Sequence, residues 1–319
     1  MDTNLTVRQQ DTAIGDVSQN AKRYARQSRA SATVRRYKSA WAEFANFAEV
    51  RGEVALPSQP STVIEYITAL ADAGQAVSTI GVKLAAIAQV HTLAGVASPT
   101  SHPSVKTVMS GIRRELKSAP VKKLPATLPE VRAMVDTLDL AGLKGLRDRA
   151  LLLVGFGGAF RRSELVALDR ADLELTSEVL RIAVRSSKTD QTGKGLLKTI
   201  PAIGGALCPV RAMREYLDAA GIASRAVFRR VNRWGSTGKR LTAQSVALVV
   251  KAAAAAADLD ASRFAGHSLR SGFINACLDA GVSDADITEQ TGQTVTTMHG
   301  YRQASGVGSS RAVRGAFGE

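Results

Sequence analysis

The chain has 319 residues, of which 45% are hydrophobic, and this is enough to form a packed core in about two domains. It carries 42 Lys and Arg against 28 Asp and Glu, a formal net charge of +14. So basic a balance is expected of a protein that meets a polyanion, with nucleic acid as the leading candidate. The basic residues are spread along the chain rather than gathered on one amphipathic helix, which argues against a membrane-surface role.

Several common classes of site and location are excluded. Cys208 and Cys277 lie far apart, so neither a disulfide framework nor a zinc site is indicated, and a reducing cytosol is expected. The sequence has no H-E-x-x-H pattern and no glycine-rich phosphate loop. It also has no apolar leader and no run long enough to span a membrane. We therefore expect no metal, no cofactor and no membrane partner.

The first 120 residues predict a small helical bundle. Residues 1–20 are polar and aperiodic, which is typical of a flexible tail. Within 21–118, apolar residues recur every three or four positions in four runs, which begin near Thr33, Pro60, Ile80 and Val105. This domain is therefore predicted to be a helical bundle, with His91 on an apolar face as a core residue.

A proline-rich linker is predicted at 119–129, because its three prolines disfavour helix. We expect DNA contacts from basic residues of the bundle, of the linker and of the second domain. These residues are Arg35, Arg36, Lys38, Lys83, Lys122, Lys123 and Arg162. The first three lie between apolar positions of the first helix, which places them on its outer face.

Residues 130–319 predict a second domain that is mainly α with a small antiparallel sheet. Its first helices are expected over 130–138 and through 150–154, and a glycine-rich turn then leads to Arg161. Two β-like runs, 179–185 and 196–202, flank a polar stretch and predict a hairpin with a mobile tip. Everything after Cys208 is predicted to be helical, including the alanine-rich stretch up to Ala257.

A histidine and an arginine stand three residues apart in Gly266-His267-Ser268-Leu269-Arg270, and a tyrosine, Tyr301, follows. On a helix His267 and Arg270 would share one face, where an imidazole can transfer protons and a guanidinium can bind phosphate oxygens. The H-x-x-R spacing alone is also typical of a core histidine beside a surface arginine. Its meaning therefore depends on the rest of the chain.

Four short motifs in a fixed order provide that context. They are Arg161-x-Ser163-Glu164-Leu165, Lys188 in the predicted hairpin, His267-x-x-Arg270 and Tyr301. In this order, after a basic helical bundle, the chain resembles the tyrosine recombinase, or phage integrase, family over nearly its whole length, and the Cre-like members in particular. The resemblance implies a helical core-binding (SAM-like) domain followed by an α+β catalytic domain.

The chemistry of strand cleavage explains these residue types. Charge on the non-bridging phosphate oxygens needs planar cations, a role that suits Arg161 and Arg270, and the Tyr301 phenol needs a proton acceptor, for which His267 is the candidate. The resemblance implies that Lys188 protonates the leaving 5′ oxygen. Glu164 is expected to orient the basic residues. The product would be a 3′-phosphotyrosine, which reseals without ATP.

The resemblance also implies a homotetramer on paired double-stranded DNA sites with inverted repeats, exchanging strands through a four-way junction. The chain departs from the family pattern at Gln293, where a histidine or tryptophan is usual; an amide can donate a hydrogen bond to phosphate but cannot transfer a proton. His299 is a possible substitute or a solvent-facing side chain. The tail after Tyr301 either docks on a neighbouring subunit or is a frayed terminus.

Two alternative functions stay open at this point. A type IB topoisomerase or a telomere resolvase would share the arginines and the tyrosine. A DNA-binding accessory or regulatory protein with an impaired site would share the fold, and Gln293 motivates that reading. Formation of a covalent protein–DNA adduct separates the enzymes from the binding protein.

Overall fold

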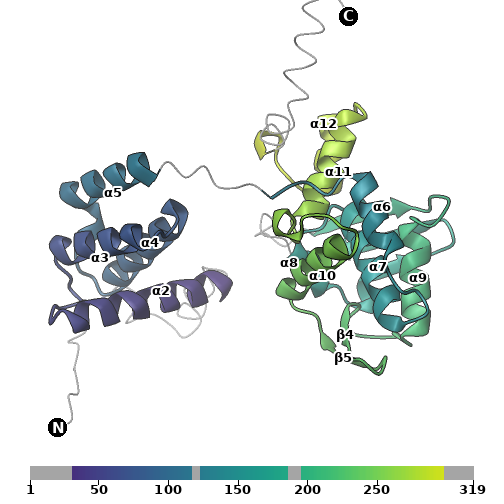
Figure 1. Cartoon of the computed structure of the whole chain (residues 1–319), viewed down its shortest axis with the longest axis horizontal. Helices are drawn as coiled ribbons and strands as arrows, with labels where there is room; N and C mark the ends of the chain where they lie inside the picture. The colour runs from purple at the N-terminus through teal and green to yellow at the C-terminus, as the bar shows by residue number, and fades with distance from the viewer. Residues whose placement is uncertain (1–30, 117–122, 186–194, 298–319) are drawn as a thin grey trace, which may run out of the picture. The chain divides into compact units, whose positions relative to one another are not determined.

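The computed structural model describes residues 31–116, 123–185 and 195–297. The chain divides into two units, Met1–Val121 and Lys122–Glu319, which Figure 1 labels by element. The break falls inside the segment 119–129 that the prolines predict as a linker. The predicted N-terminal tail and the residues after 297 lie outside the described part of the chain.

The described part of the first unit is a bundle of four α-helices. They are α2 (Ser31–Val50), α3 (Pro60–Asp72), α4 (Val77–Leu93) and α5 (Pro103–Leu116). Their apolar faces meet in one core, where Phe44, Ile67 and Ile80 are fully buried. The four predicted runs thus correspond to these helices, and the spacing of three and four residues fixes which side of each faces inward.

His91 is a core residue, as its position on the apolar face predicts. Its ring is buried, Nε2 accepts a hydrogen bond from the Ser58 N–H at 3.0 Å, and Nδ1 lies 2.9 Å from the Ile87 carbonyl. These partners fit a neutral imidazole that donates through Nδ1. His91 therefore serves packing in the bundle.

The described part of the second unit contains seven α-helices. They are α6 (Leu128–Asp136), α7 (Leu143–Gly157), α8 (Arg162–Ala167), α9 (Pro209–Ala219), α10 (Ala243–Ala256), α11 (Ser268–Asp279) and α12 (Asp284–Thr291). The apolar α7 occupies the centre and packs against α9 and α11 (Figure 1). Residues of α7 such as Leu151 and Leu152 are fully buried, so this helix forms the centre of the core of the second unit.

A three-stranded antiparallel sheet carries the predicted hairpin. Its order is β1 (Leu173–Leu175), β2 (Val179–Val184) and β3 (Leu196–Pro201). Side chains alternate along each strand, so Leu180 and Ile182 face the core while Ala183 faces solvent. The hairpin of β2 and β3 is confirmed; β1 was not predicted.

A second hairpin corrects the prediction that all residues after Cys208 are helical. Strands β4 (Arg229–Val231) and β5 (Thr237–Arg240) pair antiparallel. The Asn232 side chain closes the turn, because its Oδ1 accepts from the N–H groups of Trp234 and Ser236, both at 2.9 Å. Such an Asx turn forms a hairpin without any alternation of apolar residues.

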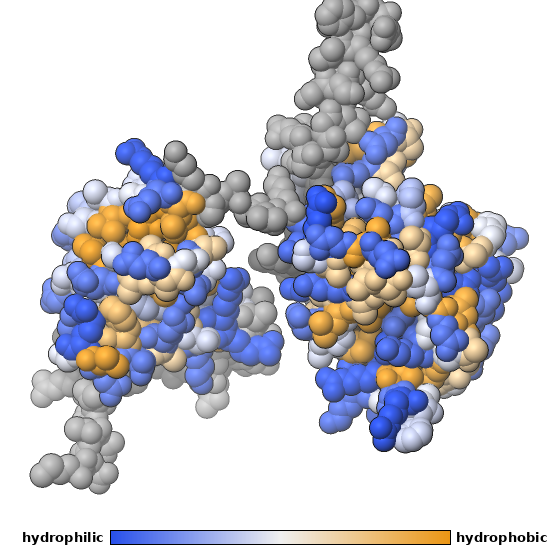
Figure 2. All heavy atoms as spheres, viewed as in Figure 1, coloured by the Kyte–Doolittle hydropathy of each residue, from blue (hydrophilic) through white to orange (hydrophobic). Residues whose placement is uncertain are grey.

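The surface carries many hydrophilic residues. Figure 2 shows hydrophilic residues spread over the visible face of both units rather than gathered on one element. In the part of the chain that the structure describes, no helix combines the length and the apolar character needed to cross a membrane.

Candidate active site

The first segment of the candidate site is a tight turn between α7 and α8. Gly158 is required there, since a Cβ would lie 2.2 Å from the ring of Phe160. Arg161 ends the turn as the residue before α8, and Glu164 is buried one turn later. The Glu164 carboxylate accepts the backbone N–H of Arg161 at 2.9 Å and pairs with its Nη1 at 2.6 Å. Glu164 thus holds both the main chain and the guanidinium of Arg161.

The second segment is the start of α11. His267 is the N-cap residue of this helix, which begins at Ser268. Arg270, one turn in, has 0% exposed surface. It donates through Nη1 to the carbonyl of Ala159 and through Nη2 to that of Thr291 at 2.9 Å. Arg270 therefore joins the turn before Arg161 to the end of α12.

Gln293 lies beside Arg270. With its amide assigned so that the oxygen faces the guanidinium, Oε1 accepts from Nη2 at 3.0 Å and from Nε at 3.1 Å. Gln293 is itself buried. The Gln293 amide oxygen therefore accepts two hydrogen bonds from the Arg270 guanidinium. The sequence pattern did not predict this contact.

The electrostatics of His267 follow from its neighbours. The imidazole is exposed, yet the surrounding protein atoms partly desolvate it and lower its pKa, and the positive charges of Arg270, Arg161 and Arg162 lower it further. The neutral ring is thus favoured at neutral pH. A neutral imidazole is the form that can accept a proton.

Lys198 is a charged residue of this region that the motifs did not reveal. It lies on β3 with 0% exposed surface, and its pKa is lowered to about 7 by burial, with Arg270 and Arg161 acting in the same direction and Glu164 opposing them. The sequence did indicate that Lys198 is buried, because in a strand it lies on the same face as the apolar residues Leu196 and Ile200. Lys198 therefore belongs to the same electrostatic environment as the arginines.

The structure thus brings together part of the predicted set. Arg161, Glu164, His267, Arg270 and Gln293 converge from α8, α11 and the end of α12. Lys188, His299, Tyr301 and Lys122 lie outside the described residues. Among the described residues, no three His, Cys, Asp or Glu side chains gather as ligands of a metal ion.

The predicted DNA-contacting residues are mostly exposed. Arg35, Arg36 and Lys38 lie on the outer face of α2, and Arg162 begins α8 beside Gly266. Lys123 is exposed too, although its Nζ donates to the Ser262 carbonyl at 2.7 Å. These positions are compatible with phosphate contacts.

Lys83 contradicts its predicted role. The residue is 9% exposed, its Nζ is paired with Glu43, and it lies 5.8 Å from the centre of the Tyr66 ring. The ammonium is bound by the Glu43 carboxylate and lies over the Tyr66 ring, so it is not presented at the surface as a group for phosphate contacts. Lys83 therefore acts within the fold of the first unit.

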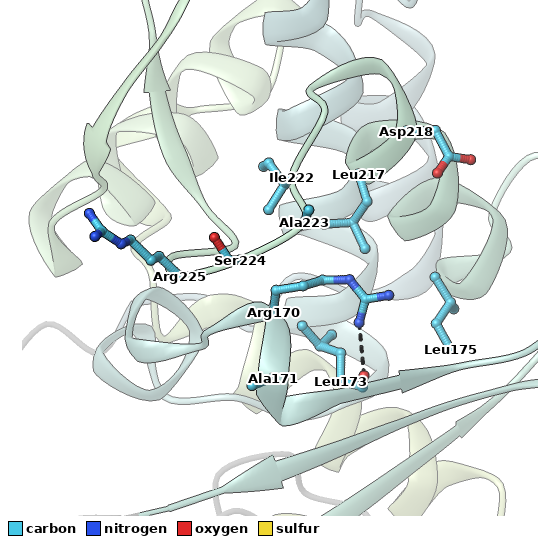
Figure 3. Close-up of a pocket in the computed structure, with 10 residues that line it drawn as sticks. All are labelled: Arg170, Ala171, Leu173, Leu175, Leu217, Asp218, Ile222, Ala223, Ser224 and Arg225. Carbon is cyan, nitrogen blue, oxygen red and sulfur yellow. Dashed lines mark hydrogen bonds between the residues drawn. The ribbon is translucent and has the colours of Figure 1, made fainter.

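One cavity of the second unit lies away from these residues. It measures about 510 Å³ and is lined by residues of the turn before β1, of α9 and of the loop that follows α9, including Arg170, Leu217 and Arg225 (Figure 3). Arg170 turns inward and donates to the Leu173 carbonyl at 3.0 Å. The residues that line it include none of those predicted for catalysis. The convergence of charged groups, rather than this cavity, indicates the candidate site.

Comparison with known proteins gives the same answer as the geometry. The model of the Phage integrase family matches residues 127–305, which include the two arginine motifs and Tyr301. The chain belongs to the phage integrase family. It is accordingly a tyrosine recombinase, an enzyme that cuts and rejoins DNA strands.

Relatives of this integrase-family chain match it over most of its length. An integrase/recombinase XerD homolog of Selenomonas ruminantium is 37% identical over 280 residues, covering 86% of this chain and 82% of the relative. The tyrosine recombinase XerC of Herpetosiphon aurantiacus is 29% identical over 287 residues, covering 88% and 87%.

Solved recombinases share the fold. The site-specific recombinase XerH bound to a palindromic difH substrate aligns with a TM-score of 0.59 at 15% identity, over 80% of this chain and 72% of that one. A lambda integrase dimer bound to a core site aligns at 0.57 and 17% identity, over 88% and 92%. At such identities the likeness concerns the mainly α fold with its small antiparallel sheets.

Proposed function

We propose that this recombinase breaks and rejoins DNA at specific paired sites through a 3′-phosphotyrosine formed on Tyr301. One observation carries the proposal: Arg161 and Arg270 lie in one charged environment with His267, each guanidinium held by protein oxygens. Two fixed guanidiniums beside a neutral imidazole are suited to a phosphodiester that gains charge during reaction.

In the proposed cleavage step, the Tyr301 oxygen attacks the phosphorus and its proton passes to His267. The bond from phosphorus to the 5′ oxygen breaks as Lys188 donates a proton to that oxygen. Arg161 and Arg270 neutralise the non-bridging oxygens. The phosphotyrosine keeps the energy of the broken phosphodiester, so a 5′ hydroxyl from a second strand can reverse the step.

The proposed assembly is a homotetramer that holds two double-stranded sites, each with inverted repeats, and exchanges strands through a four-way junction. Support comes from the family and from the solved structures of recombinases bound to DNA that share its fold. Arg35, Arg36 and Lys38 on α2, with Arg162 and Lys123 of the second unit, supply exposed basic groups for phosphate contacts.

A nicked suicide substrate tests the chemistry. The nick lets the cleaved fragment diffuse away, so the full chain is expected to accumulate as a covalent adduct that migrates slowly in a denaturing gel. Tyr301→Phe should form no adduct while binding the same DNA with unchanged affinity, because only the nucleophilic oxygen is removed. Tyr216→Phe, which changes a tyrosine in the core of the second unit, is the matched control and should retain the adduct.

The alternatives predict other results. DNA binding without any adduct would reject the enzyme and favour an accessory binding protein. An adduct followed only by relaxation of a plasmid that carries two sites would favour topoisomerase-like chemistry. Exchange of the segment between the two sites is the result expected of the recombinase.

A further inference from the structure

Lys198 is a buried basic residue for which the cleavage chemistry above has no use. Its neighbours on β3, Leu197 and Thr199, are exposed, whereas Lys198 itself points into the protein. Burying an ammonium is costly unless it finds partners. The partners are the carbonyl of Gln290, to which Nζ donates, and the ring of Phe160, whose centre is 5.1 Å from Nζ.

Further contacts join the same two segments. Gln290 Nε2 donates to the carbonyls of Gly157 at 3.1 Å and of Thr199 at 3.3 Å. Gly292 packs so closely on Leu196 that an added Cβ would lie 2.9 Å from Leu196 Cδ2. We call this set of contacts, between Leu196, Lys198 and Thr199 on β3 and Gln290 and Gly292 at the end of α12, the β3–α12 link.

The link is charged as well as packed. The last carbonyls of a helix carry its negative dipole end, and here a different basic side chain donates to each of two successive ones: Lys198 to the carbonyl of Gln290 and Arg270 to that of Thr291. Arg270, Arg161 and Glu164 are also the groups that act on the pKa of Lys198. The link therefore shares the electrostatic environment of Arg161 and Arg270, and Arg270 binds the carbonyl of Thr291, which lies between Gln290 and Gly292.

The two linked segments are followed or preceded in the chain by Lys188 and Tyr301, two of the predicted residues that lie outside the described part. Strand β3 follows the loop that carries Lys188, and α12 precedes the segment that carries Tyr301. Where a loop presents its side chains depends on where its ends are held. A misplacement of about 1 Å in a reacting group can cost on the order of 100-fold in rate.

We propose that Lys198 is a positioning residue that fastens the β2–β3 hairpin to the end of α12, so that the hairpin loop presents Lys188 to the leaving 5′ oxygen. This inference rests on the proposed function, in which Lys188 is the proton donor. It assigns Lys198 no contact with DNA and no proton of its own in the reaction.

A substrate with sulfur in place of the bridging 5′ oxygen tests the inference. A thiol has a pKa of about 8.5, so the sulfur leaves without a proton donor, whereas the oxygen requires one. Lys198→Met keeps an unbranched side chain without the ammonium. We expect adduct formation on the oxygen substrate to fall by about 10- to 100-fold, the range seen when a supporting contact is lost, and on the sulfur substrate to fall much less.

The ratio of the two rates excludes a purely structural role, because a smaller fraction of folded protein lowers both rates equally. Lys188→Met should show the same rescue by sulfur, and Lys144→Met, an exposed lysine on α7, should leave both rates unchanged. An equal loss of Lys198→Met on both substrates, or no loss, would overturn the inference. A wild-type chain that forms no adduct on either substrate would instead reject the proposed function.

Hydrogen exchange tests the link without reference to activity. In Lys198→Met the amides of β3 and of the last turn of α12 should exchange faster, and those of α9 should not change. Gln290→Leu removes the second part of the link from a partly exposed position and should have the same effect, even if Lys198→Met folds poorly. Unchanged exchange at β3 in both variants would overturn the inference.

Discussion

His267 combines exposure with a lowered pKa, which is what a proton acceptor at neutral pH requires. Its pKa lies below the ordinary value of about 6.5, since partial desolvation and three arginines disfavour the imidazolium. The neutral form therefore persists as pH falls toward 6.5 and is lost only in more acidic solution. The decline of the cleavage rate at acidic pH therefore measures the protonation of His267.

We predict that the rate of adduct formation stays constant as the pH is lowered from about 8 to about 6.5, and that it declines only below about pH 6.5. His267→Gln should cleave more slowly at every pH and should lack the acidic decline, because an amide does not titrate. Single-turnover measurements on the suicide substrate provide both profiles. A decline that begins above pH 7 in the wild-type chain would contradict the lowered pKa.

The role of some residues was predicted from the sequence, whereas the environment of others was not. Arg161, Glu164 and His267 were predicted because each belongs to a short motif with fixed spacing. The environments of Lys83 and Lys198 depend on which face each residue occupies. Lys83 stands three residues after Ile80 and four before Ile87, so helical spacing already placed it on the inner face of α4.

The helix that carries His267 and Arg270 is fixed by close contact with the end of the linker. The Ala126 N–H donates to the Ser268 carbonyl at 2.8 Å, and a Cβ on Gly272 would lie 1.7 Å from the Ala126 oxygen. Only glycine permits this approach. Segment 124–126 and helix α11 therefore pack backbone against backbone.

We predict that Gly272→Ala destabilises the second unit by about 1–3 kcal/mol or more, the usual cost of overpacking, because the backbone of Ala126 must move. Gly111→Ala on α5, where an added Cβ meets nothing within 4 Å, is the control and should stabilise the first unit by about 0.5–1 kcal/mol. Thermal unfolding of the full chain, followed as separate transitions, measures both. Equal stability of Gly272→Ala and wild type would refute the tight contact.

Elements with a strong periodicity were predictable and those formed by turn chemistry were not. The bundle helices and the β2–β3 hairpin follow from apolar residues at the spacing of a helix or a strand. The β4–β5 hairpin is largely polar and exposed, so its strands carry no alternation to detect. Its one signal was the Asn232 turn, whose geometry depends on two side-chain hydrogen bonds.

The net charge of +14 concerns the chain as a whole, but only exposed charges contribute to DNA binding. Lys38 and Lys83 are both lysines of the first unit with opposite environments: Lys38 is exposed on α2, whereas Lys83 is enclosed with Glu43. The salt dependence of DNA affinity distinguishes the two lysines. Each phosphate contact releases counterions and adds about 0.9 to the steepness of log affinity against log salt concentration.

We predict that Lys38→Met weakens binding to all DNA sequences about equally and lowers the salt slope by about 1. Lys83→Met, the same change at a buried site, should leave the slope unchanged and lower the unfolding temperature of the first unit. Binding of the full chain to a duplex at several salt concentrations gives both slopes. If Lys83→Met lowered the slope as much as Lys38→Met, Lys83 would have to reach the phosphates, and its enclosure by Glu43 and Tyr66 would have to open when DNA binds.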